Sequence, residues 1–318
     1  MMLTQFSAPR SFDENREGVH KDGVTKPPLI FDRTLWRQRL SRALRSGHPC
    51  DFLVRRAAED IVFRLEGISR AFPRALDLGG LHPAIFRALA APGRLVAQAA
   101  PVEGALGAEG LRVVADEEAL PFAPQSFDLV VSTLNLQFAN DLPGVFAQIR
   151  RVLAPDGLFL AAIIGARTLV ELRACLVQAQ DEIEMGASPR VAPFADLRDL
   201  GGLLQRAGFA LPVTDSDVFS VRYRNAFDLM RDLRAMGATN VLVAGARRPL
   251  RRSVAFRAAA IYADKFADPD GRIRATFEII WASGWAPHES QQQPLAPGSA
   301  QMPLSAALGD KSLRSPRR

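Results

Sequence analysis

The sequence predicts an α/β protein built on a parallel sheet that is covered by helices on both faces. Between residues 74 and 165, short apolar runs alternate with amphipathic stretches of helical length. The last of these runs, 158–164, is apolar throughout, as expected for a strand buried on both faces. This alternation is typical of a doubly wound sheet, in which each strand is followed by a helix.

Five strands are expected in this region from runs of apolar and β-branched residues: 75–78, 95–97, 111–115, 127–132 and 158–164. A helix at 83–90 has proline in its first turn, and a helix at 142–153 ends before the turn-forming Pro155-Asp156-Gly157. Later helices are expected at 168–184, 194–207, 227–236 and 249–266, and extended runs at 213–223 and 275–285.

Changes in composition divide the chain into four parts. Residues 1–29 are polar and aperiodic and are expected to be a disordered lead. Leucines alternate with arginines in 30–70, which predicts an N-terminal helical extension. The main domain is expected at 71–293, with a helical insertion at about 168–266. Residues 294–318 are rich in Pro, Gly, Ser and Arg and are expected to be a loose tail.

The composition excludes several classes of protein. With 318 residues, 48% hydrophobic and 23% charged, the chain can bury a large core without disulfides or metals. Two cysteines exclude a disulfide scaffold and suit a reducing compartment. No apolar run approaches the roughly 20 residues of a membrane span, so none is expected. Acidic residues interrupt the N-terminus, which argues against a signal or transit peptide and makes the cytoplasm the expected location.

The net charge of +6 comes from clustered arginines. One group has helical spacing: Arg33, Arg37, Arg39, Arg42 and Arg45. A second group lacks an intervening acid: Arg247, Arg248, Arg251, Arg252 and Arg257. Each group is either a solvated helix face or a docking face for an acidic protein or nucleic acid. The groups lack interleaved aromatic residues, so binding of nucleic acid is the weaker interpretation.

The sharpest local motif is Asp77-Leu78-Gly79-Gly80-Leu81-His82-Pro83, a strand that enters a glycine turn and then a helix. In a doubly wound sheet this turn lies at the carboxyl ends of the strands, where ligands bind. Glycines let a ligand approach the backbone, and amides at the helix start can hold an anion. The alternative is an ordinary tight connection.

A second motif follows the third strand and reads Ala115-Asp116-Glu117-Glu118-Ala119-Leu120-Pro121-Phe122. An acid in this place can accept a hydrogen bond from an adenine amino group. Asp116 can equally serve as a helix cap.

Together with Ser126-Phe127-Asp128-Leu129-Val130-Val131-Ser132, these motifs resemble the class I S-adenosylmethionine-dependent methyltransferases over residues 74–165. The closest group contains the malonyl carrier-protein methyltransferases. The flanking segments Ile30-Phe31-Asp32-Arg33, 199–209 and Pro287-His288-Glu289-Ser290-Gln291 resemble one branch over residues 30–300. That branch is the methyltransferase-like assembly factors of respiratory complex I, which are protein arginine hydroxylases, and their bacterial relatives.

The resemblance implies a seven-stranded, mostly parallel sheet whose last strand is antiparallel, with a pocket for S-adenosylmethionine at the carboxyl ends of the first strands. It implies these cofactor-binding residues: Asp77, Gly79, Gly80, Asp116, Glu117 and Asn135. It identifies neither catalytic residues nor metal ligands.

Three residues depart from the methyltransferase pattern. Leu81 and Pro83 replace the second and third glycines of the motif, and Pro83 lacks an amide donor. Ala100 stands where the family has an acid that binds the ribose hydroxyls. Because a hydrogen bond to a charged group contributes roughly 1.5–3 kcal/mol, we expect S-adenosylmethionine to bind weakly or not at all.

Two functions remain open from the sequence. The first is an enzyme acting on a protein in complex I assembly, by methyl transfer or arginine hydroxylation. The second is a non-catalytic assembly or binding factor with a degenerate cofactor site. His288-Glu289 is an acid–base pair, part of an iron site, or a segment that packs the C-terminus onto the sheet.

Overall fold

The computed structural model describes residues 29–47, 50–244, 249–292 and 299. The predicted lead and tail therefore lie outside the described residues, except for Leu29 and Ser299. Arg247 and Arg248 of the second arginine group lie outside them as well.

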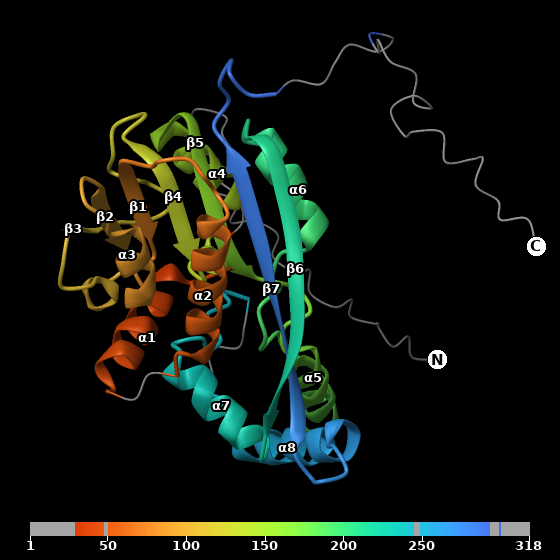
Figure 1. The fold of residues 1–318 in the computed structure, drawn as a ribbon. Coiled ribbons are helices and arrows are strands. Elements are labelled where there is room, and N and C mark those ends of the chain that lie inside the picture. The colour runs from red at the N-terminus through yellow and green to blue at the C-terminus, as the bar shows by residue number, and fades with distance from the viewer. Residues whose placement is uncertain (1–28, 48–49, 245–248, 293–298, 300–318) are drawn as a thin grey trace, which may run out of the picture.

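A seven-stranded sheet in the order β3-β2-β1-β4-β5-β7-β6 forms the centre of the molecule (Figure 1). The strands are β1 (Arg74–Leu78), β2 (Leu95–Ala100), β3 (Leu111–Val114), β4 (Phe127–Thr133), β5 (Leu153–Ile164), β6 (Ala210–Tyr223) and β7 (Ile273–Trp285). The first five are parallel, and β7 runs antiparallel to both β5 and β6. This confirms the predicted α/β fold with a doubly wound, mostly parallel sheet and an antiparallel last strand.

Eight α-helices and two short 3₁₀ helices are present in the described part of the chain. The α-helices are α1 (Arg33–Arg45), α2 (Phe52–Glu66), α3 (Pro83–Leu89), α4 (Leu142–Val152), α5 (Val170–Glu184), α6 (Leu197–Arg206), α7 (Ala226–Ala235) and α8 (Arg252–Phe266). The 3₁₀ helices are η1 (Glu103–Ala105) and η2 (Leu136–Phe138). No helix in these segments is long and apolar enough to cross a bilayer.

Alternation along the strands divides the core between the two faces of the sheet. On one face, residues such as Leu129 and Leu158 pack against α2, α3, α5, α7 and α8. On the other face, their neighbours Val130 and Phe159 pack against α4 and α6. Figure 1 shows α2 and α3 in front of the sheet. Burial on both faces explains why the middle of β4 and the second half of β5 are apolar at consecutive positions.

Two predicted bounds differ in the structure, each for a local reason. The predicted helical extension 30–70 contains α1 and α2. The helix predicted at 194–207 begins at Leu197, because the Asp196 side chain caps it by accepting a hydrogen bond from the Arg198 amide. Strand β5 begins at Leu153 and passes through the predicted turn, where Asp156 has a φ of +61°. The stretch 168–266 holds α5 to α8 together with strand β6.

The N-terminal extension is held against the sheet by one buried arginine. Arg33, at the start of α1, has only 10% of its side chain exposed and pairs with three consecutive acids of the loop after β3. Its guanidinium lies 2.9 Å from Asp116, 2.7 Å from Glu117 and 3.2 Å from Glu118. Glu117 is fully buried, so this pair joins two charges removed from water.

A second set of contacts fixes the segment before α1. The side-chain oxygen of Asn140 accepts hydrogen bonds from the amides of Ile30 and Phe31, and its nitrogen donates to the Phe31 carbonyl. Phe31 and Trp36 then pack on Phe138 of η2. The extension is thus part of the domain core, and it covers the carboxyl edge of the sheet.

We expect Arg33→Ala to lower the free energy of unfolding by about 3 kcal/mol or more, because it leaves the buried Glu117 carboxylate unpaired. The matched control is Arg37→Ala. Arg37 also pairs with Asp116, but its side chain is 35% exposed, so the expected loss is below about 1 kcal/mol. Urea unfolding measures both. Equal losses for the two variants would show that the buried pair does not hold the extension.

Candidate functional site

The predicted site begins at the carboxyl end of β1. Asp77 pairs in register with Gln98 of β2 and Val131 of β4, and it is 2% exposed. Its carboxylate accepts a hydrogen bond from the Gly80 amide, and its Oδ2 atom has no hydrogen-bond partner. Burial raises the pKa of Asp77 to about 7, against the opposing effect of the Gly80 amide.

The two glycines after β1 are required by close approach of the chain. Gly79 has a φ of +128°, and a Cβ atom added there would lie 2.9 Å from Cβ of Asn135. Gly80 has a φ of +62°, and its added Cβ would lie 2.6 Å from the Ala105 carbonyl oxygen. These positions therefore tolerate only glycine, even without a ligand.

Polar side chains without partners gather where β1 and β4 end. Asn135 is fully buried, yet neither its amide oxygen nor its amide nitrogen has a hydrogen-bond partner. The hydroxyls of Ser132 and Thr133, at the end of β4, are also buried and unpartnered. Leu134, between Thr133 and Asn135, has a left-handed φ of +49°. Unpaired buried polar groups and a strained backbone both cost free energy, and they concentrate at ligand sites.

Two of the unpartnered atoms are acceptors, Asp77 Oδ2 and Asn135 Oδ1, whereas the Ser132 and Thr133 hydroxyls can both donate and accept. A group that carries several N–H donors and a positive charge would satisfy the two acceptors. The ammonium group of a methionine moiety has this character, and so does a guanidinium. These residues therefore fit the methionine end of S-adenosylmethionine.

The acids predicted to contact adenine belong to a different network. Asp116 and Glu117 pair with Arg33, and Asp116 also pairs with Arg37. Burial raises the pKa of the Glu117 carboxyl, although the Arg33 charge opposes this effect. Arg33 was assigned from the sequence to a helical group of arginines. Its pairing with the acids after β3 was not predicted, because helical spacing does not show which residues lie opposite.

The position where the resemblance places the ribose is apolar. Ala100 is fully buried in a cluster with residues of α1, η1 and η2 and of the segment after α7, among them Trp36 and Phe138. Leu81 packs against the same cluster. No side chain of this cluster can accept a hydrogen bond from ribose hydroxyls. The described residues thus fit the methionine end of the cofactor, and at its ribose end the acid nearest to Ala100 in sequence is the exposed Glu103 of η1.

The His288 segment lies at the opposite edge of the sheet. β7 ends near the start of β5, where Gln291 donates hydrogen bonds to Asp156 and to the Ala286 carbonyl. His288 is exposed, and its Nδ1 atom lies 2.7 Å from Ser290 Oγ. Of the three interpretations, the structure supports packing of the C-terminus. Within the described segments, no three His, Cys, Asp or Glu side chains are grouped to hold a metal ion.

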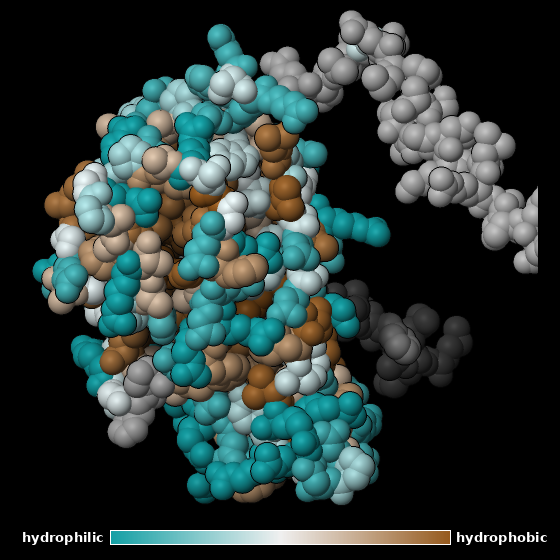
Figure 2. Space-filling view, viewed as in Figure 1, coloured by the Kyte–Doolittle hydropathy of each residue, from teal (hydrophilic) through white to brown (hydrophobic). Residues whose placement is uncertain are grey.

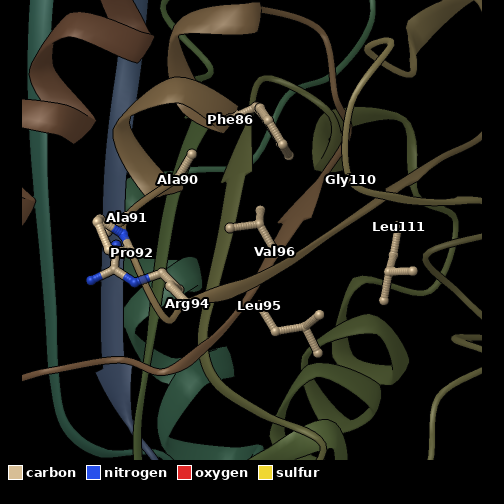
Figure 3. A pocket seen from close by; sticks show the side chains of 9 residues that line it. All are labelled: Phe86, Ala90, Ala91, Pro92, Arg94, Leu95, Val96, Gly110 and Leu111. Atoms are coloured by element: carbon tan, nitrogen blue, oxygen red, sulfur yellow. The ribbon is translucent and has the colours of Figure 1, made fainter.

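A separate surface hollow lies beside the amino end of β2 (Figure 3). Its walls are mainly apolar, and they include Phe86, Leu95, Val96 and Leu111. Because ligands of doubly wound sheets bind at the carboxyl ends of strands, this hollow is distinct from the predicted cleft.

The raised pKa of Asp77 predicts a pH dependence of stability. Below about pH 4 the folded and unfolded states both hold the proton, whereas between about pH 4 and about pH 7 only the folded state holds it. The contribution of Asp77 to the free energy of unfolding therefore falls as the pH rises through this window. Asp77→Asn removes the titration, so the wild type should lose up to about 4 kcal/mol relative to the variant. Urea unfolding at several pH values tests this, and a constant difference between the two proteins would refute it.

Comparison with known proteins agrees with this geometry. The methyltransferase domain family matches residues 77–161, which run from Asp77 into β5. Human mitochondrial arginine-hydroxylase NDUFAF5 is 40% identical over 299 residues, covering 90% of this chain and 86% of the human protein. The malonyl-[acyl-carrier protein] O-methyltransferase of Halorhodospira halophila is 39% identical over 173 residues, covering 54% of this chain and 57% of that protein.

Among solved structures, the YcgJ protein of Bacillus subtilis superimposes with a TM-score of 0.51 at 15% identity, over 74% of this chain and 99% of that one. At this identity the similarity concerns the fold alone. The match to the human protein extends over nearly the whole of both chains, beyond the methyltransferase domain. The chain belongs to the family of the arginine-hydroxylase NDUFAF5 proteins.

Proposed function

We propose that this protein acts on another protein during assembly of respiratory complex I, by hydroxylating an arginine side chain in the cleft at the carboxyl ends of β1 and β4. The observation that carries the proposal is the group of buried, unpartnered acceptors around Asp77 and Asn135. A guanidinium offers five N–H donors and a permanent charge, which match these acceptors. The family relationship supports arginine as the side chain.

Hydroxylation replaces a C–H bond of the substrate by C–OH. One oxygen atom of dioxygen enters that bond, and the other leaves as water with two electrons from a reductant and two protons. The chain's own contribution is to hold and desolvate the guanidinium. Asp77, whose pKa burial raises to about 7, would ionise as the cation enters. Asn135 would accept a second hydrogen bond. We assign no other chemical role to a residue of this chain.

The first test uses a strain that lacks this chain. Mass spectrometry of its complex I subunits should show one arginine-containing peptide without the mass of an oxygen atom, and the wild-type gene should restore that mass. Gain of a methylene mass instead would identify methyl transfer. If no strain contains a modified arginine, but complex I still requires this chain for assembly, the result would support the non-catalytic assembly factor.

Asn135→Ala provides a sharper prediction, because Asn135 makes no hydrogen bond in the free protein. We expect the free energy of unfolding to fall by less than about 0.5 kcal/mol or to rise, while modification of the substrate arginine decreases at least about tenfold. Asn140→Ala is the matched control. Asn140 holds Ile30 and Phe31, so its loss should lower stability by about 1–3 kcal/mol. Full modification by Asn135→Ala protein would contradict the proposed site.

We further propose that S-adenosylmethionine binds weakly, through its methionine end only. Leu81 and Ala100 limit binding at the ribose end, where they belong to an apolar cluster. The double variant Leu81→Gly/Ala100→Asp supplies a ribose acceptor and removes the leucine side chain. It should bind S-adenosylmethionine at least about tenfold more tightly than the wild type in calorimetric titration.

The control for this experiment is Leu81→Gly/Ala100→Asn, which has the same size but no charge. It should gain much less affinity. Equal affinity of the wild type and the aspartate variant would show that Leu81 and Ala100 are not what limits binding.

We also propose a cytoplasmic location, which the free thiols of Cys50 and Cys175 support. The human relative is named as a mitochondrial protein.

A further inference from the structure

Two exposed phenylalanines meet on the surface formed by α7 and α8. Phe256 of α8 is 63% exposed and Phe227 of α7 is 37% exposed. Their ring centroids are 5.4 Å apart, with an edge-to-face angle of 65°. Large apolar rings exposed as a pair are unusual on a protein surface, and aromatic side chains are among the commonest anchors of protein interfaces.

Arginines surround this pair by helical spacing. Arg252 precedes Phe256 by four residues on α8, and Arg231 and Arg234 follow Phe227 by four and seven residues on α7. Residues at these spacings share a helix face with the ring. Arg231 is 68% exposed. Arg234 and Arg252 are also exposed, and neither forms an ion pair with a described residue. We call these three arginines and the two rings the aromatic surface.

The aromatic surface carries an excess of positive charge. Its three arginines give three positive charges, and among the described residues only Arg231 of the three forms an ion pair, with Asp228, which also pairs with Arg224. The other acid of α7, Asp232, interacts with Cys50 and Tyr223. The end of the molecule formed by α7 and α8 in Figure 1 is mostly hydrophilic in the same view of Figure 2. An apolar centre with a charged rim is the usual anatomy of a protein interface.

We propose that the aromatic surface docks an acidic protein segment that carries an apolar anchor side chain. The anchor would pack on Phe227 and Phe256, and carboxylates on either side would pair with Arg231, Arg234 and Arg252. Charge complementarity selects an acidic partner. A protein fits better than a nucleic acid, because the edge-to-face arrangement of the rings offers no slot in which a planar base could stack.

The aromatic surface lies close to the carboxyl edge of the sheet. Helix α7 follows β6 directly, and β6 runs parallel to β5, so α7 starts at the same edge of the sheet as the cleft. Helix α7 also contacts α1, which covers that cleft. A protein bound to the aromatic surface would therefore lie beside the extension that closes the site. The docking proposal does not depend on the chemistry of the cleft.

The test is selection of a random peptide library displayed on phage against the full chain at low salt. Enriched peptides should be acidic and should share an aromatic or aliphatic residue. Synthetic versions should bind at least about tenfold more weakly to Phe256→Ala and to Arg252→Glu, because each change removes an anchor contact or reverses a charge. Both residues are exposed, so the variants should fold, and circular dichroism checks this.

Matched controls carry the same substitutions on other helices. Phe63→Ala removes a 72% exposed ring from α2, and Arg87→Glu reverses an exposed charge on α3. Both should bind the selected peptides as the wild type does. The proposal fails if no acidic peptides are enriched, or if they bind all four variants equally. It also fails if a single-stranded oligonucleotide binds more tightly than the peptides and loses affinity in both aromatic-surface variants.

Discussion

The buried ion pair between Arg33 and Glu117 is the constraint on which the cleft depends. A fully buried carboxylate requires a partner, and among the described residues the basic side chain that pairs with Glu117 is Arg33, 84 positions away in the chain. This pair brings α1 over the carboxyl edge of the sheet, where Trp36 and Leu40 complete an apolar cluster with Ala100. The extension is thereby both a structural element of the domain and the cover of its ligand site.

The cover divides the cleft into two chemically different halves. Around Ala100 and Leu81, apolar side chains are satisfied by one another, and a sugar would bring unpaired hydroxyls into their midst. Around Asp77 and Asn135, polar atoms are buried without partners. This burial costs free energy, and the domain remains folded because the rest of its stability exceeds that cost. The first half gains nothing from a polar ligand, whereas the second half gains hydrogen bonds from one. We propose that this asymmetry distinguishes the protein from a methyltransferase that binds both ends of its cofactor.

The elements that sequence could predict are those set by local patterns. The apolar runs of β1 and β4 and the Gly79-Gly80 turn follow from residues close together in the chain, and the sheet they form is present. The ion pairs of Arg33 could not be predicted, because periodicity places an arginine on a helix face without saying what lies opposite. The unpartnered state of Asn135 was equally hidden, since it depends on how tightly Gly79 approaches. The predicted turn at Asp156 became a bulge within β5 because its flanks pair with β4 and β7.

The free energy needed to move α1 away from the sheet affects which size of ligand can bind. To reach Glu117 or Asp116, an adenosine would have to compete with Arg33, and breaking such a buried pair costs about 3–5 kcal/mol. A ligand shifts this equilibrium only by its differential affinity for the open state, and the apolar ribose end offers little. A guanidinium on a protein side chain needs no such opening at the ribose end, because its donors address Asp77 and Asn135. We therefore propose that the same buried arginine that stabilises the fold favours a small cationic group over a nucleoside at this edge of the sheet.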